Sequence, residues 1–178
     1  MAIPHIITDL AKRIQLLICD VDGVLTTGEI YLNNDDDEFK AFNVKDGLGI
    51  KLLMQNGIDV AVITARKSKV VARRMSELGV THLYQGQQDK RLAYQELLTQ
   101  LSLTSDHVAY VGDDLPDLAM MRESALGFAP ADAVPLVRDQ SDWALTACGG
   151  RGVVREIAHI LLESQGKLDD IHAEYLNK

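Results

Sequence analysis

Short apolar runs alternate with longer amphipathic stretches along most of the chain. Several of these runs are apolar at consecutive positions, as is typical of parallel strands that are buried on both faces. We therefore predict strands at residues 16–20, 58–64, 81–84, 107–113, 125–129 and 143–146.

Between these runs, apolar residues recur three or four positions apart, which is the spacing of one buried helix face. The recurring positions are Val71, Met75 and Leu78, then Ala93, Leu97 and Leu101, and finally Val154, Ile157 and Leu161. Strands that alternate with helices in this way favour an α/β fold with a doubly wound parallel sheet, covered by helices on both faces.

Residues 28–44 depart from this alternation. Two extended runs flank Asn33, Asn34 and the acidic residues 35–38. Because Asn and Asp favour turns, the segment predicts a β-hairpin insertion with a solvated turn. The acidic run lacks the spacing and the glycine of an EF-hand, so we do not expect it to bind calcium.

The composition narrows the class of protein. The chain has 178 residues, of which 47% are hydrophobic and 25% charged, and this predicts a single globular domain over residues 1–178. A formal net charge of −8 argues against a basic surface for nucleic-acid backbones. No apolar run reaches the roughly 18 residues of a membrane span. The first residues also lack the pattern of a signal peptide, so we expect a cytoplasmic protein that binds neither nucleic acid nor membranes.

Polar side chains gather where the predicted strands end. They are Asp20 and Asp22 after the first strand, Thr64 after the second, Lys90 at the start of the helix after the third, and Asp113 and Asp114 after the fourth. Ligands of open parallel sheets bind at this carboxyl edge. Each residue alone is more simply a turn, a helix cap or a solvated charge. Together they suit phosphoryl transfer, which depends on positioning and on charge neutralisation.

These residues also stand in recognisable motifs. The run Asp20-Val21-Asp22-Gly23-Val24-Leu25-Thr26 resembles DxDGxxT, the first motif of the haloacid dehalogenase superfamily. Ile63-Thr64 resembles the second motif and Lys90 the third, and Gly112-Asp113-Asp114-Leu115-Pro116-Asp117 resembles the fourth, GDDxxD. All four motifs appear in the order of the superfamily, and the first and fourth lie about ninety residues apart.

The resemblance implies a magnesium-dependent phosphatase with a Rossmann-like haloacid dehalogenase fold. Asp20 would be the nucleophile that forms an aspartyl phosphate, and Asp22 would protonate the leaving oxygen and then activate water. Asp20, the backbone carbonyl of Asp22, and Asp113 would hold Mg²⁺. The resemblance places three further residues around the phosphoryl group: Thr64, Lys90 and Asp114.

The spacing of the motifs leaves no room for a cap domain. Thirty-seven residues separate Thr26 from Thr64, and 25 separate Thr64 from Lys90. Almost end to end, the chain resembles the capless 3-deoxy-D-manno-octulosonate 8-phosphate phosphatases of bacterial lipopolysaccharide biosynthesis. This likeness implies a small phosphorylated sugar acid as substrate and a homotetramer whose hairpins pack together. We expect the glycine-rich segment 149–156 to help close the site of a neighbouring subunit.

The same likeness implies a set of substrate contacts. The extra basic residues among them would bind the carboxylate that a sugar acid carries besides its phosphate. Ala65 stands where relatives commonly have Gly, and Lys45 and Lys51 where Arg is common. The implied contacts are Asp22, Asn43, Val44, Lys45, Asp46, Gly47, Lys51, Arg66, Arg74, Lys90 and Asp114.

Three alternatives stay open at this point. The chain is a phosphatase for another sugar or sugar-acid phosphate, a non-catalytic oligomerisation module of the same fold, or a phospho-acceptor domain of the receiver type. A receiver carries its acceptor after the third strand and lacks an acid two residues later, which disfavours it here. The chain contains no GxxxxGK[ST] phosphate loop and no GxSxG nucleophile motif.

Overall fold

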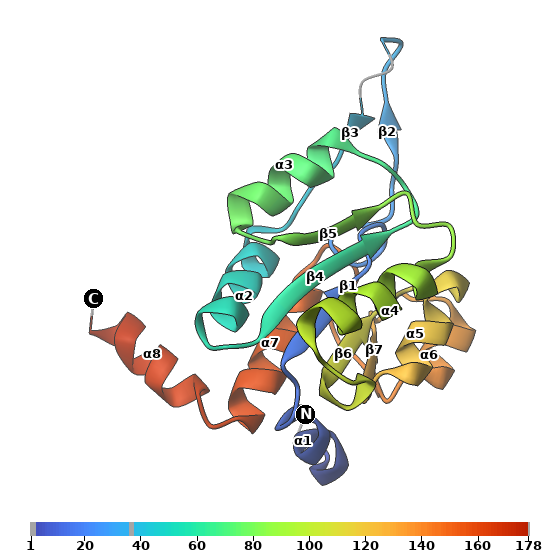
Figure 1. Cartoon of the computed structure of the whole chain (residues 1–178). Helices are drawn as coiled ribbons and strands as arrows, with labels where there is room; N and C mark the ends of the chain where they lie inside the picture. Colours follow the sequence, from blue (N-terminus) through green and yellow to red (C-terminus); the bar gives the residue numbers. More distant parts are fainter. Residues whose placement is uncertain (1–2, 36–37, 178) are drawn as a thin grey trace.

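The computed structural model describes residues 3–35 and 38–177, and a six-stranded parallel sheet forms its centre (Figure 1). The strands lie in the order β5-β4-β1-β6-β7-β8, and all neighbouring pairs are parallel. They are β1 (Leu16–Cys19), β4 (Asp59–Thr64), β5 (His82–Gln85), β6 (Val108–Val111), β7 (Leu126–Ala129) and β8 (Trp143–Ala144). All six correspond to predicted strands, and the doubly wound α/β fold is confirmed.

Helices cover both faces of this sheet and divide the core in two. One core lies under α1, α2, α3 and α7, and the other lies under α4, α5 and α6. The helices are α1 (His5–Ala11), α2 (Val44–Gln55), α3 (Lys69–Leu78), α4 (Lys90–Leu101), α5 (Leu118–Glu123), α6 (Pro135–Gln140), α7 (Val153–Ser164) and α8 (Leu168–Leu176). Among the described residues, no helix combines the length and the apolar character needed to cross a bilayer.

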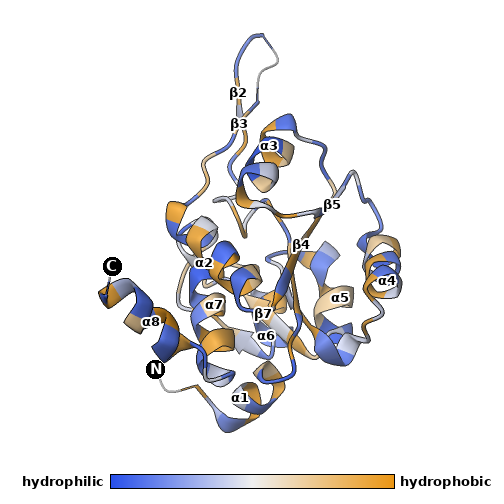
Figure 2. Ribbon diagram, turned by 60° about the vertical axis from the view of Figure 1, so that its left-hand side comes forward, coloured by the Kyte–Doolittle hydropathy of each residue, from blue (hydrophilic) through white to orange (hydrophobic). Residues whose placement is uncertain are grey.

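Side chains alternate between the two cores along each strand, as the pleat requires. On β1, Leu17 and Cys19 enter the first core, whereas Leu16 and Ile18 enter the second. In Figure 2 the strands and the inner sides of the helices are largely hydrophobic, and the hydrophilic residues lie outward. Burial on both faces explains why the strands appear in the sequence as unbroken apolar runs.

The predicted hairpin is present and projects from the body of the molecule (Figures 1 and 2). Its strands β2 (Tyr31–Leu32) and β3 (Glu38–Phe39) are antiparallel, with Tyr31 opposite Phe39. Asp36 and Asp37 of the acidic run lie outside the described residues. Between β4 and β5 the chain forms only α3, and within the described part of the segment from β1 to α2 it forms only the hairpin. The described segments therefore include no cap domain, as the spacing of the motifs predicts.

The apolar pattern does not predict every helix. α5 and α6 contain six residues each, which is too short for a repeat of apolar positions to show. α8 follows α7 closely and extends away from the sheet (Figure 1), with Leu176 largely exposed. None of these three helices contains a residue of the predicted motifs; α5 begins directly after the fourth motif.

Asp46, a predicted contact of the substrate, has a structural role in the fold, because it joins α2 to α7. Its buried carboxylate accepts hydrogen bonds from the backbone N–H groups of Gly152 and Arg155, each at 3.0 Å. The first N–H groups of a helix have no partner within the helix, so Asp46 satisfies two donors at the start of α7. Gly49 allows the close approach, because a side chain there would press against the backbone of Arg155. That Asp46 also contacts substrate stays a prediction.

We expect Asp46→Ala to lower the free energy of unfolding by about 1–3 kcal/mol, because it leaves buried N–H groups without acceptors. Urea denaturation followed by circular dichroism measures the change. Asp139→Ala on the exposed side of α6 is the control and should change stability by less than about 0.5 kcal/mol. Equal effects of the two substitutions would contradict the role given to Asp46.

Candidate active site

A pocket of about 310 Å³ lies at the carboxyl edge of the sheet, next to the ends of β1, β4 and β6. The six polar residues that the motifs predict there all line it. The lining consists of Asp20, Asp22, Gly28, Thr64, Ala65, Arg66, Lys90, Asp113, Asp114, Pro116 and Asp117. Parallel strands bring these distant parts of the sequence to one edge, as expected for this class of fold.

A buried ammonium group joins two buried carboxylates at the floor of the pocket. Lys90 Nζ donates to Asp20 Oδ1 at 2.5 Å and to Asp117 Oδ1 at 2.7 Å. The hydroxyl of Tyr110 on β6 also donates to Asp117 Oδ1, at 2.8 Å. Burial alone would lower the pKa of Lys90, but Asp20 and Asp117 outweigh it and raise that pKa. Lys90 therefore stays charged and fixes one oxygen of Asp20.

Asp117 is a functional residue that reasoning from the sequence did not place. It ends the GDDxxD motif, and a helix cap or a partner for Arg is the ordinary interpretation of such an Asp. In the structure it pairs with Lys90, and its other oxygen accepts from the backbone N–H of Asp114 at 3.5 Å. The GDDxxD motif indicated that Asp117 lies near the site, but it did not indicate that the side chain points toward Lys90.

Carboxylate oxygens of Asp20, Asp113 and Asp117 lie within 4.8 Å of one another, which fits a hard divalent cation. Gly23 makes room for this group, because a side chain there would overlap the carboxylate of Asp113. Burial and Asp117 raise the pKa of Asp20 to about 7 against the opposing effect of Lys90. Burial, Asp20 and Asp117 raise the pKa of Asp113 to about 7. The donor set thus fits Mg²⁺, with the carboxylate of Asp117 beside it; the contribution of the Asp22 carbonyl stays a prediction.

Thr64 and Asp114 complete the pocket on two sides. Thr64 is buried at the end of β4, and its hydroxyl accepts from the backbone N–H of Arg66 at 3.4 Å. Asp114 is exposed, and its carboxylate accepts from the N–H of Leu115 at 2.8 Å, at the start of the short helix Leu115–Asp117. Both side chains line the pocket, where a phosphoryl group would meet them.

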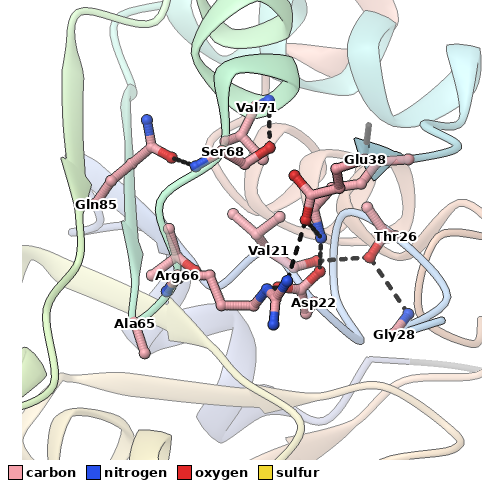
Figure 3. A network of polar contacts seen from close by, with 12 residues as sticks. Val21, Asp22, Thr26, Gly28, Glu38, Ala65, Arg66, Ser68, Val71 and Gln85 are labelled. Carbon is pink, nitrogen blue, oxygen red and sulfur yellow. Dashed lines mark hydrogen bonds and ion pairs between the residues drawn. The ribbon is translucent and has the colours of Figure 1, made fainter. Parts of the chain in front are cut away.

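Two residues of the hairpin stem, Glu38 and Lys40, belong to an ion-pair network around Asp22, and the sequence did not indicate them. Lys40 Nζ contacts Asp22 Oδ1 and lies 3.5 Å from Glu38 Oε1. Arg66 lies 3.3 Å from Glu38 and 3.8 Å from Asp22 (Figure 3). Glu38 and Lys40 are two positions apart on an extended run, so their side chains share a face. Their spacing in the sequence indicated that the two side chains lie on one face. Nothing in the sequence indicated that the hairpin folds back toward Asp22.

The remaining predicted substrate contacts lie outside this pocket. Asn43 caps α2 by accepting from the N–H of Lys45, and its amide donates to the carbonyl of Gly150 at 3.3 Å. Gly47 leaves room for the guanidinium of Arg74, which also lies 3.6 Å from Glu77. The predicted contacts that do not line the pocket are Asn43, Val44, Lys45, Asp46, Gly47, Lys51 and Arg74.

The glycine-rich segment packs within its own chain. Gly150 N–H donates to the carbonyl of Val24 at 2.8 Å, and Gly149 N–H donates to Asp132 at 2.9 Å. A side chain on Gly149 would overlap the backbone of Gly23. Gly149 and Gly150 thus support the loop that follows Asp20 in their own chain, and their contact with a neighbouring site stays a prediction.

This fold and site define a haloacid dehalogenase-like hydrolase, and a family model of that description matches residues 74–157. More specific relatives extend over most of the chain. The 3-deoxy-D-manno-octulosonate 8-phosphate phosphatase KdsC of Salmonella typhimurium is 50% identical over 94% of this chain and 88% of its own length. The chain belongs to the family of 3-deoxy-D-manno-octulosonate 8-phosphate phosphatases.

Solved structures agree with this assignment. The phosphatase of that description from Yersinia pestis superposes with a TM-score of 0.93 at 47% identity, over 94% of this chain and 90% of the other. The one from Moraxella catarrhalis, solved with a magnesium ion, a phosphate ion and a KDO molecule, gives a TM-score of 0.93 at 43% identity. That match covers 95% of this chain and 97% of the other.

We expect magnesium to stabilise the protein more as pH rises from 5 to 8. Without metal, Asp20 and Asp113 keep their protons up to about pH 7, whereas unfolded Asp loses its proton near its usual pKa of 3.8. Between these values the folded state binds more protons, so the free energy of unfolding falls as pH rises. Magnesium binds the ionised carboxylates and reverses this loss.

Differential scanning fluorimetry with and without saturating magnesium measures the effect as a change in Tm. Asp113→Asn is the control and should abolish most of the magnesium-dependent increase at pH 8. A Tm increase of the same size at pH 5 and pH 8 would contradict the explanation.

Proposed function

We propose that this protein hydrolyses 3-deoxy-D-manno-octulosonate 8-phosphate to the free sugar acid and phosphate, a step of lipopolysaccharide biosynthesis. The observation that carries the proposal is the pairing of Asp20 with Lys90 beside Asp22, Asp113 and Thr64 in one pocket. KdsC relatives about 50% identical over most of the chain are 3-deoxy-D-manno-octulosonate 8-phosphate phosphatases.

The first half of the reaction transfers the phosphoryl group to the protein. The carboxylate of Asp20 attacks phosphorus in line, and the bond from phosphorus to the sugar oxygen breaks. Asp22 gives its proton to that oxygen as it leaves. Lys90 keeps one oxygen of Asp20 in place and, with Thr64, offsets the charge of the phosphoryl oxygens.

The second half returns the protein to its starting state. Asp22, now ionised, takes a proton from water, and the water oxygen attacks phosphorus of the aspartyl phosphate. The bond from phosphorus to Asp20 breaks, and phosphate leaves. Asp20 and Asp113 would hold Mg²⁺, whose positive charge would offset the repulsion between carboxylate and phosphate.

The geometry also bears on the two rival classes of function. A non-catalytic oligomerisation module of this fold would have no use for the motif acids, yet all of them converge on one pocket here. A receiver domain would carry its acceptor after the third strand, whereas Asp20 follows β1 in the centre of the sheet. Another sugar-acid phosphate is the nearest alternative substrate, and assays with pure protein distinguish it.

We also propose that the protein is a homotetramer. Tyr31, Leu32 and Phe39 are largely exposed on the projecting hairpin, and short exposed strands of this kind can pair between subunits. Lys51 and Arg74 do not line the pocket of their own chain, and their contact with substrate stays a prediction. The cytoplasmic location stays a prediction.

Asp20→Asn should lower turnover by several orders of magnitude, because the amide cannot act as the nucleophile. Phosphate release from the octulosonate phosphate measures the loss, and circular dichroism checks that the fold is retained. We expect the fold to survive, since Asn is isosteric with the buried Asp. Retention of a tenth of the wild-type rate in a pure sample would exclude Asp20 as the nucleophile.

Light scattering should report a mass of about four times 19.6 kDa. Leu32→Glu should dissociate the tetramer, because it places a charge in the proposed contact between hairpins. Leu136→Glu on α6 is the matched control, since Leu136 is exposed as well, and should leave the mass unchanged. An active monomer, or a tetramer that is unaffected by Leu32→Glu, would refute the proposed assembly.

A further inference from the structure

The ammonium group of Lys40 is the most completely buried charge near Asp22. Its side chain is 1% exposed, whereas that of Asp22 is 21% exposed and lines the pocket. Lys40 Nζ contacts Asp22 Oδ1, and the nearest other acid among the described ion pairs, Glu38, is 3.5 Å away. A buried cation requires such partners, so Lys40 and Asp22 restrict each other's position.

Arg66 differs from Lys40 in its freedom to move. Its side chain is 46% exposed and lines the pocket, and its Nε lies 3.8 Å from Asp22 Oδ2, beyond hydrogen-bond distance. Glu38 holds Arg66 on one side and Lys40 on the other (Figure 3 shows Glu38 above Asp22 and Arg66). Arg66 is thus available to a substrate, whereas Lys40 is enclosed by protein.

The two oxygens of Asp22 consequently have different surroundings. Oδ1 is occupied by Lys40, and Oδ2 lies on the side of Arg66, which is the side of the pocket. A carboxyl group that gives a proton to a leaving oxygen must present one chosen oxygen at hydrogen-bond distance. A fixed Oδ1 removes the rotation that would turn Oδ2 away.

We propose that Lys40 is a positioning residue for the acid–base step: it holds Oδ1 of Asp22 so that Oδ2 faces the leaving oxygen of the substrate. The inference rests on the proposed phosphatase function and adds a residue that none of the motifs contains. As the bond from phosphorus to oxygen breaks, the proton on Oδ2 moves to the leaving oxygen. In the second half Oδ2 takes a proton from water.

The test compares leaving groups, because only a poor leaving group needs a proton. In Lys40→Met, kcat/KM for an alkyl phosphate should fall about 100-fold, the lower end of the usual contribution of general acid catalysis. For p-nitrophenyl phosphate, kcat/KM should stay within about 3-fold of wild type, because nitrophenolate leaves without a proton. Hydrolysis of the aspartyl phosphate still needs Asp22 and should be slower in the variant. Nitrophenol should therefore be released in an initial burst before steady turnover.

Three further variants separate positioning from other roles. Lys69→Met, at an exposed start of α3, is the matched control and should change neither substrate. Lys40→Arg keeps the charge and should restore part of the loss on the alkyl phosphate. Adding Lys40→Met to Asp22→Asn should cause little additional loss, because both act on the same step.

Equal losses on both substrates would show that Lys40 only maintains the structure, and this would overturn the proposal. A raised KM with unchanged kcat for the alkyl phosphate would assign Lys40 to substrate binding, which also overturns it. Lys40→Gln, which also removes the charge, provides the same comparison if Lys40→Met does not fold. The octulosonate phosphate and a simple alkyl phosphate are assayed side by side. Wild-type inactivity on the first alone would refute the proposed substrate without affecting the test of Lys40.

Discussion

The pocket depends on one balance of charge: the single ammonium of Lys90 lies between the buried carboxylates of Asp20 and Asp117. With Asp113 nearby, acids outnumber this ammonium, and the surplus raises the pKa of Asp20 and Asp113. A buried surplus of negative charge is costly unless protons or a cation compensate it. The need for a metal and the reactivity of the nucleophile therefore have the same electrostatic origin. The sheet maintains this arrangement, because β1 and β6 carry the acids on adjacent strands.

The sequence predicted the parts of the fold and site that follow from periodicity and topology. Buried parallel strands give apolar runs, and their carboxyl ends must meet, so the gathering of Asp20, Thr64 and Asp113 at one edge followed from the order of residues alone. The direction in which an individual side chain points was harder to predict. Resemblance to a family indicated Asp46 as a residue of interest, but only the structure shows its carboxylate turned toward α7. Lys40 could not be predicted, because its contact with Asp22 depends on how an 18-residue detour folds back.

The hairpin carries two kinds of side chain. Tyr31, Leu32 and Phe39 of its strands are exposed and apolar, whereas Glu38 and Lys40 form ion pairs with Arg66 and Asp22 beside the pocket. The ion pairs of the stem connect the loop after β1 with the loop after β4, where Arg66 lies. A small insertion thus supports two residues that line the pocket, Asp22 and Arg66, without lining the pocket itself.

The packing of Gly149 and Gly150 against the loop after Asp20 has a consequence for the order of folding during synthesis. Val24 is synthesised well before Gly150, so the hydrogen bond from Gly150 to Val24 forms only after strands β4 to β8, which lie between them in the sequence, have been translated. The hydrogen bond from the Asn43 amide to the carbonyl of Gly150 also forms only once Gly150 has been synthesised. Contacts so distant in sequence form late, because the chain between them must be ordered first. The loop that carries Asp22 and Gly23 therefore gains its contacts with Gly149 and Gly150 only after most of the sheet has formed.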